Sequence, residues 1–308
     1  MIWPVQSRIN VRSLLIASVS TACLHCWPGT ARAVEGLPAY PVGITEGVAL
    51  GALPPPGFYV FDTLAYQSSS FRNGAGHRIP VSVDALYDLG AVLWASDLQL
   101  LGGRYSALMA QAVGYGSLSS FGAKHESAGV TGTLLFPLRL SWQLSDNLFT
   151  TGSFGTLAPH GGFRARAPLN FDIGYWALEP TVTVSWLQPG LELTAHVTNV
   201  INMTNPSTHY RSGDAVYIDY TVLRPIDKWA VGISGYAAYQ FEDDTVNGAS
   251  VAASPFNGPG SRYRQFATGP LIGYDFGPLS VTGYYNRVLF ATNAPKGDNF
   301  WLRVAVPF

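Results

Sequence analysis

The chain has 308 residues, with 18 Lys and Arg against 19 Asp and Glu, and a formal net charge of -1. Only 12% of the residues are charged, 13% are aromatic, and the mean hydropathy is +0.15. This composition excludes an intrinsically disordered chain, and the lack of a positive balance or a basic run excludes a nucleic-acid binder. An apolar chain of this kind is typical of a membrane protein. After the N-terminal region, however, the longest uncharged apolar run is Leu89 to Ala95. A transmembrane helix needs about 20 residues, so a helical membrane protein is excluded.

Residues 1–33 have the layout of a secretory signal peptide. Arg8 and Arg12 precede an apolar stretch, and Ala31 and Ala33 supply small residues for cleavage after Ala33. A short buried helix is the alternative interpretation. Both cysteines lie in this segment, so the chain from residue 34 onward has no disulfide and must be held together in another way.

Residues 34–56 form a pre-barrel segment that ends in Pro54, Pro55 and Pro56. Three prolines cannot donate ladder hydrogen bonds, which argues against a central strand. One interpretation is a polyproline turn that leads into the first strand. The other is that the segment folds into the lumen as a plug.

From residue 57 to residue 308, apolar and polar residues alternate with a period of two. The last nine residues place Phe300, Leu302, Val304, Val306 and Phe308 on one face of a strand. A soluble sandwich alternates in the same way. The membrane interpretation is favoured because the apolar faces are rich in Leu, Val and aromatic residues, while the opposite faces are mixed polar and small. A charge on a lipid-facing wall costs up to about 2–4 kcal/mol, so we assign the charged faces to the lumen.

The pattern predicts an all-β fold, a transmembrane up-and-down antiparallel β-barrel. Twelve strands are expected, near residues 57–67, 79–94, 98–113, 129–143, 147–157, 170–187, 191–200, 211–223, 228–241, 262–276, 279–290 and 299–308. Short and long connections alternate between them, as the periplasmic turns and outer loops of bacterial outer-membrane barrels do. Ten and fourteen strands remain alternatives.

Eleven residues are predicted to line the lumen. The charged and histidine candidates are Asp84, Asp88, Arg139, Glu192, His196, Asp219, Glu242 and Arg303, and the aromatic candidates are Tyr217, Tyr236 and Tyr284. The charged set is mainly acidic, which would disfavour small anions unless opposite charges pair across the interior. The tyrosines either provide a path for apolar solutes or fill a narrow barrel.

The sequence carries little sign of catalysis. Glu192 and His196 share the polar face of one strand, and an intrabarrel hydrolase is one interpretation of this pair. A hydrogen-bonded network in the lumen is the simpler one. No histidines have metal-ligand spacing and no nucleotide or hydrolase motif occurs, so no enzyme activity, metal or cofactor is predicted.

Several motifs resemble one known family. They are Tyr40-Pro-Val-Gly43, Leu53-Pro-Pro-Pro-Gly57, Tyr210-Arg-Ser-Gly213, Lys228-Trp-Ala-Val-Gly232 with the Gly235–Gln240 run and the acidic loop after it, and Asn299-Phe-Trp-Leu302. Together they resemble the phenol meta-degradation (MetA-pathway) family of outer-membrane transporters, the SphA-like proteins. The resemblance implies a Gram-negative outer-membrane barrel linked to the catabolism of aromatic or hydrophobic compounds. It implies no binding residues.

The predicted function is passive uptake of small hydrophobic, and in particular aromatic, compounds across the bacterial outer membrane. The alternative is a closed structural or surface-interaction barrel that works through its long outer loops. Expected partners are outer-membrane lipid and lipopolysaccharide, the small solute, and the barrel-assembly machinery, because the terminal Phe308 resembles the C-terminal signal of such barrels. No nucleic-acid partner is expected, and the sequence leaves the oligomeric state open.

Overall fold

The computed structural model describes residues 38–160, 162–251 and 262–307. The signal peptide predicted for residues 1–33 and the terminal Phe308 lie outside these residues. Among the described residues, no helix is long and apolar enough to cross a bilayer. The strands are β1 (Gly57–Arg72), β2 (Arg78–Leu100), β3 (Gly103–Ser120), β4 (Ala123–Val130), β5 (Thr133–Gln143), β6 (Leu148–Ala158), β7 (Ala177–Gln188), β8 (Leu191–Asn202), β9 (Tyr210–Arg211), β10 (Ala215–Ile226), β11 (Trp229–Gln240), β12 (Thr245–Val246), β13 (Ala249–Ser250), β14 (Arg264–Asp275), β15 (Ser280–Thr292) and β16 (Pro295–Pro307).

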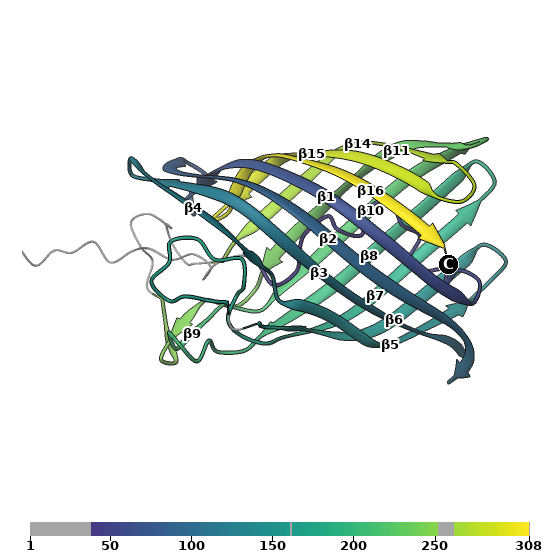
Figure 1. Cartoon of the computed structure of the whole chain (residues 1–308), viewed down its shortest axis with the longest axis horizontal. Coiled ribbons are helices and arrows are strands. Elements are labelled where there is room, and N and C mark those ends of the chain that lie inside the picture. The colour runs from purple at the N-terminus through teal and green to yellow at the C-terminus, as the bar shows by residue number, and fades with distance from the viewer. Residues whose placement is uncertain (1–37, 161, 252–261, 308) are drawn as a thin grey trace, which may run out of the picture. The chain divides into compact units, whose positions relative to one another are not determined.

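The long strands form one closed antiparallel ring (Figure 1). β1 pairs with β2 on one side and with β16 on the other, so the first and last strands close the wall. The ring contains thirteen strands, but β4 and β5 share one position beside β3, which leaves twelve positions. The predicted twelve-stranded up-and-down barrel is therefore confirmed. Closure pairs the backbone groups of every wall strand, which a bilayer requires because it offers them no water.

The two ends of the ring differ in their connections. At one end, which we call the turn end, β1 begins and β16 stops, and short turns join the strands. The turn between β2 and β3 is only two residues long, and both Leu101 (φ 52°) and Gly102 (φ 74°) have the left-handed conformation that suits a tight hairpin. At the other end, which we call the loop end, the connections after β6, β8 and β11 are longer. Their described residues are 159–160, 162–176, 203–214, 241–251 and 262–263, and β9, β12 and β13 pair into a small separate sheet.

Some predicted loops are paired strands instead. Residues 68–78, 114–128 and 291–298 mostly continue β1 to β4, β15 and β16 as hairpins, and the sixth wall strand, β7, begins at Ala177 rather than near residue 170. These extensions are rich in Ser, Gly and charged residues, and they carry little apolar alternation. Backbone pairing needs no apolar face, so a hairpin beyond the lipid gives no period-two signal.

Outer and inner faces alternate along each wall strand. On β2, Leu86 and Val92 are exposed, whereas Ala85 and Ala91 are buried. Cross-strand aromatic pairs mark two levels of the outer face: Phe58 with Trp94 near the turn end, at 6.4 Å between ring centroids, and Tyr66 with Phe300 further up, at 6.5 Å. Aromatic girdles at two levels are characteristic of barrels in a membrane.

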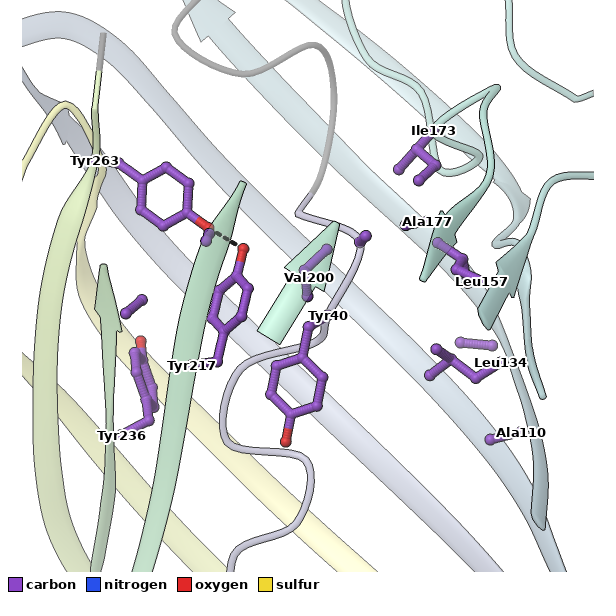
Figure 2. Packing of buried hydrophobic residues seen from close by; sticks show 14 of the residues in the cluster. Tyr40, Ala110, Leu134, Leu157, Ile173, Ala177, Val200, Tyr217, Tyr236 and Tyr263 are labelled. Carbon is purple, nitrogen blue, oxygen red and sulfur yellow. Dashed lines mark hydrogen bonds between the residues drawn. The ribbon is translucent and has the colours of Figure 1, made fainter. Parts of the chain in front are cut away.

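The core of the protein is the inside of the ring. Buried side chains from the strands pack there against Tyr40, which comes from the segment before β1 (Figure 2). The loop-end segment 159–176 adds Phe171, Ile173 and Tyr175 to the buried set, and the Phe171 ring lies edge-on to Tyr87 at 5.6 Å. The lumen is therefore packed with side chains.

Candidate functional site

Residues 38–56, which we call the inner segment, lie inside the ring. Near the loop end, Tyr40 packs against Tyr217 on β10 with 5.2 Å between ring centroids. Further along, the backbone N–H of Gly51 donates a 3.1 Å hydrogen bond to the Ser185 hydroxyl on β7. Near the turn end, the Arg104 guanidinium on β3 donates to the carbonyls of Leu53 and Pro54. The inner segment is thus held by side chains along its length.

Asp219 on β10 is one of the two main anchors of the inner segment. Its carboxylate accepts hydrogen bonds from the Tyr40 hydroxyl (2.7 Å), the Gly43 N–H (3.0 Å), the Thr45 N–H (3.2 Å) and the Thr45 hydroxyl (2.7 Å). Asp219 is only 2% exposed. A buried carboxylate is stable only where donors satisfy it, and here a single stretch of chain supplies them.

Arg303 on β16 is the second anchor. Its guanidinium donates to the backbone carbonyls of Ile44 and Glu46, to the Thr63 hydroxyl and to the Tyr284 hydroxyl. The neighbouring Asn286 amide donates to both oxygens of the Glu46 carboxylate, at 2.8 and 2.9 Å. Side chains of β15 and β16, as well as Asp219 of β10, therefore hold the inner segment by hydrogen bonds.

The predicted aromatic candidates all lie on the inner face and are buried. Tyr217 contacts the Tyr263 hydroxyl, Tyr236 accepts a 3.0 Å hydrogen bond from the Asn299 amide, and Tyr284 donates to the Gly43 carbonyl at 3.0 Å. The inner-face Trp301 stacks on Tyr284, with ring centroids 5.5 Å apart. Tyr217 and Tyr284 thus contact the inner segment directly, through Tyr40 and Gly43.

His196 and Glu192 lie on the inner face of β8 but do not form a unit. His196 is buried between the Thr183 hydroxyl at 2.6 Å and the Thr198 hydroxyl at 2.9 Å, and its ring stacks on Tyr40. Glu192 is half-buried nearer the turn end, and the contacts of His196 with Thr183, Thr198 and Tyr40 do not include it. In the described part of the chain, His196 therefore belongs to a threonine network and lacks the acid partner that a hydrolase would need.

Two further inner-face charges have no hydrogen-bond partner among the described residues. Glu179 on β7 is fully buried with both carboxylate oxygens unpaired, and Arg139 on β5 is 4% exposed with its Nε unpaired. Arg139 lines a cavity of about 230 Å³ between the inner segment and the wall. Arg139 was among the predicted lumen residues, whereas Glu179 was not.

Asp84 and Asp88 do not lie where the sequence analysis placed them. Both are exposed on the outer face of β2, between buried neighbours such as Val83 and Ala85. The alternation is real, but the apolar set that includes Val83 faces inward because loop-end and inner-segment residues fill the lumen and provide an apolar surface there. Asp84 accepts a 2.6 Å hydrogen bond from the Ser68 hydroxyl. Asp88 contacts a second outer-face carboxyl group, that of Asp62.

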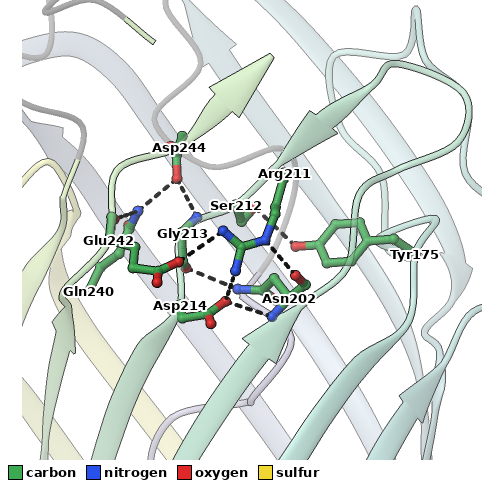
Figure 3. A network of polar contacts seen from close by, with 9 residues as sticks. All are labelled: Tyr175, Asn202, Arg211, Ser212, Gly213, Asp214, Gln240, Glu242 and Asp244. Atoms are coloured by element: carbon green, nitrogen blue, oxygen red, sulfur yellow. Dashed lines mark hydrogen bonds and ion pairs between the residues drawn. The ribbon is translucent and has the colours of Figure 1, made fainter. Parts of the chain in front are cut away.

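Glu242 also lies outside the lumen, in a polar network at the loop end (Figure 3). Arg211 makes ion pairs with Asp214 at 2.7 Å and with Glu242 at 2.9 Å. Asp244 accepts hydrogen bonds from the Gly213 N–H at 2.8 Å and the Gln240 amide at 2.7 Å. Burial raises the pKa of Asp244 to about 6. This network ties the connection 203–214 to the connection that follows β11.

Sequence reasoning missed the partners that the inner segment supplies. Tyr40, Thr45 and Glu46 occur in a stretch without periodicity, and their contacts join residues far apart in the chain. The sequence pointed to them only indirectly, because a plug inside the lumen was one interpretation of residues 34–56. In the described residues, no three His, Cys, Asp or Glu side chains cluster as a metal site would require.

Comparison with known proteins gives one family and a set of similar folds. The model of the family described as "Putative MetA-pathway of phenol degradation" matches residues 68–304. The fold is similar to the crystal structure of the COG4313 outer membrane channel from Pseudomonas putida F1, with a TM-score of 0.72, 15% identity, and coverage of 83% of this chain and 97% of that chain. The translocator domain of the autotransporter NalP from Neisseria meningitidis gives a TM-score of 0.48 at 10% identity, over 83% and 90% of the two chains. The CymD monoaromatic hydrocarbon channel gives a TM-score of 0.39 at 10% identity, over 82% and 89%. A comparison with curated proteins finds no match.

Proposed function

This chain belongs to the MetA-pathway phenol-degradation family, and we propose that it is a bacterial outer-membrane channel for passive uptake of small hydrophobic, in particular aromatic, compounds. The inner-face aromatic side chains carry this proposal. Tyr217, Tyr236, Tyr284 and Trp301 line the ring interior, next to a segment held by hydrogen bonds and packing. An aromatic wall interacts with apolar rings at little cost in desolvation. No chemical step is needed, so the protein is proposed to be a channel and not an enzyme.

In this proposal, the inner segment controls the path. Its anchors are side-chain hydrogen bonds, such as those to Asp219 and Arg303, and it adds no strand to the sheet. Hydrogen bonds of this kind contribute about 1–3 kcal/mol each, so the segment can shift without opening the wall. A solute then passes between the segment and the aromatic face.

The second candidate function is a closed barrel that works through its loop end. The observation in its favour is the same inner segment, because a filled lumen conducts only if the filler moves. The network around Arg211 and Asp214, which orders the loop end, fits a binding surface as well as a channel mouth.

Reconstitution separates the two functions. Wild-type protein and a variant without residues 38–50 are placed in planar bilayers and in liposomes, and ion conductance and the uptake of benzyl alcohol and sucrose are measured. The channel proposal predicts uptake of benzyl alcohol in excess of sucrose by the wild type, and a higher conductance of the variant. A wild-type barrel that passes neither solute, in liposomes where a known porin passes both, would support the closed barrel.

The remaining expectations stay proposals that fit an outer-membrane location. They are removal of residues 1–33 on export, contact of the outer face with lipid and lipopolysaccharide, and insertion by the barrel-assembly machinery through Phe308. Mass spectrometry of the protein from outer membranes tests the first. Replacing Phe308 by Ser and measuring the amount of inserted barrel tests the last.

A further inference from the structure

Arg139 is unusual because it is a buried cation without a counter-ion. It lies on the inner face of β5, it is 4% exposed, and none of the described residues accepts a hydrogen bond from it. A guanidinium keeps its charge in proteins, and an isolated charge removed from water is costly. The position therefore favours an anion that is not part of the described chain.

A second polar group lies beside it. Ser106 on β3 is the register partner of Arg139, it is fully buried, and its hydroxyl has no partner among the described residues. On the other side, Arg139 pairs in register with Ser153 on β6. A guanidinium flanked by a free hydroxyl has the donors that a carboxylate accepts.

The cavity next to Arg139 is otherwise apolar. It has a volume of about 230 Å³ and is lined by inner-segment residues 48–50 and 52–54, by Tyr59, Phe61 and Leu93 of the wall, and by Arg139. An apolar cavity of about 150 Å³ holds one benzene molecule, and drug-sized ligands need about 300 Å³ or more. The space therefore suits a single ring with one small substituent.

Among the described residues, no acid neutralises this cation. Glu179, a second charge without a hydrogen-bond partner, lies within electrostatic range of Tyr40 and Tyr217, and none of its contacts in the described structure joins it to Arg139. Asp219 and Glu46 are engaged with the inner segment and with Asn286. The unpaired guanidinium thus lies beside an apolar cavity, and no described side chain compensates its charge.

We propose that this cavity binds one small monoaromatic carboxylate, with the ring between Phe61, Leu93 and the inner segment and the carboxylate on Arg139 and Ser106. This inference rests on the proposed channel function and names its substrate class. Binding here places the solute against residues 48–54 of the inner segment, on the side of the lumen formed by β1, β2 and β5.

The test is a binding measurement by calorimetry on the full-length protein in detergent. The probes are benzoate, its neutral analogue benzamide, and acetate. We expect benzoate to bind at least tenfold more tightly than benzamide, and acetate to bind at least a hundredfold more weakly than benzoate. In Arg139→Met, benzoate affinity falls at least tenfold, to the level of benzamide, while benzamide affinity changes less than twofold. Arg224→Met, on the exposed outer face of β10, is the matched control and leaves all three affinities unchanged.

Two results would overturn the proposal. One is equal benzoate affinity in the wild type and in Arg139→Met, and the other is acetate binding as tightly as benzoate, which would show a general anion site. If Arg139→Met does not fold, Ala49→Leu provides the test, because it fills the cavity and keeps the cation. Ala49→Leu is expected to weaken the binding of benzoate and of benzamide by the same factor, and unchanged affinities would contradict the proposal. Uptake of benzyl alcohol into liposomes is measured in parallel. Failure of uptake counts against the channel, whereas normal uptake without Arg139-dependent binding counts against this site alone.

Discussion

The Tyr40 hydroxyl donates a 2.7 Å hydrogen bond to the Asp219 carboxylate, which joins residues 179 positions apart in the chain. The contact links the inner segment to the centre of β10, and three further donors from Gly43 and Thr45 complete the shell of the carboxylate. The inner segment is thus bound through its side chains and amides to one buried charge.

Asp219→Ala is expected to loosen the inner segment. The change removes the acceptor of four hydrogen bonds and leaves the Gly43 and Thr45 amides without it, at a cost of about 2–5 kcal/mol in segment docking. We expect more frequent and larger open events in single-channel records, with an intact barrel by circular dichroism. Asp84→Ala, on the outer face, is the control and should conduct like the wild type. Identical records for Asp219→Ala and the control would contradict the role of Asp219.

Arg303→Met is expected to destabilise the same segment from the other side. The substitution removes the donors to the Ile44 and Glu46 carbonyls and to the Tyr284 hydroxyl. Because both anchors hold one segment, the effects on thermal stability of Arg303→Met and Asp219→Ala should not add. The double variant is expected to lose at least 0.5 kcal/mol less than the sum of the single variants. A fully additive double-mutant cycle would show that the two anchors act independently.

The loop-end network is expected to open less at acidic pH. Burial raises the pKa of Asp244 from 3.8 to about 6. A carboxyl group with a raised folded-state pKa contributes stability that is complete below 3.8 and is lost as the pH rises through 6. Hydrogen exchange at the Gly213 amide, corrected for its intrinsic pH dependence, should therefore show greater protection at pH 4.5 than at pH 7.5. In Asp244→Asn this dependence should be much weaker. Equal protection of the wild type at both pH values would contradict the prediction.

Replacing Asp88 by Leu is expected to stabilise the barrel in a membrane. Asp88 and Asp62 are exposed on the outer face, between the Phe58 and Trp94 pair near the turn end and the Tyr66 and Phe300 pair above. A polar group in this band faces hydrocarbon, and its removal should gain about 1–2 kcal/mol in the free energy of unfolding. Urea unfolding in lipid vesicles measures the gain. Asp84→Leu, nearer the loop end and bonded to Ser68, should gain less. A loss of stability in Asp88→Leu would indicate that a partner covers this acidic pair.

The wall of the barrel could be predicted from the sequence because each wall strand carries its own signal. β16 and β8 alternate cleanly, and short turns follow long strands, so the twelve positions could be counted. The inner positions of Asp219, Arg303 and the three tyrosines followed from the same alternation. The pattern says nothing, however, about which face is inner when the lumen is packed, and for that reason Asp84 and Asp88 were placed on the wrong side of β2.

The contents of the lumen could not be predicted in the same way. The inner segment has no periodicity, and its partners, such as Asp219 and Asn286, are known only once the ring is closed. The buried position of Glu179 could not be predicted either, because a single acidic residue followed by Pro180 forms no recognisable pattern with other polar residues. Long-range pairing, and not local preference, decides these positions.

The hydrogen bonds from Arg303 to the Ile44 and Glu46 carbonyls also link the docking of the inner segment to the closing of the barrel wall. The arginine belongs to the last strand of the chain and holds the segment before the first strand, and these two strands are the ones that close the wall. Because Arg303 lies on the strand that pairs with β1, the closing of the wall and the docking of residues 44–46 both depend on β16. A barrel that closes without residues 44–46 inside leaves the Arg303 guanidinium without its two carbonyl partners.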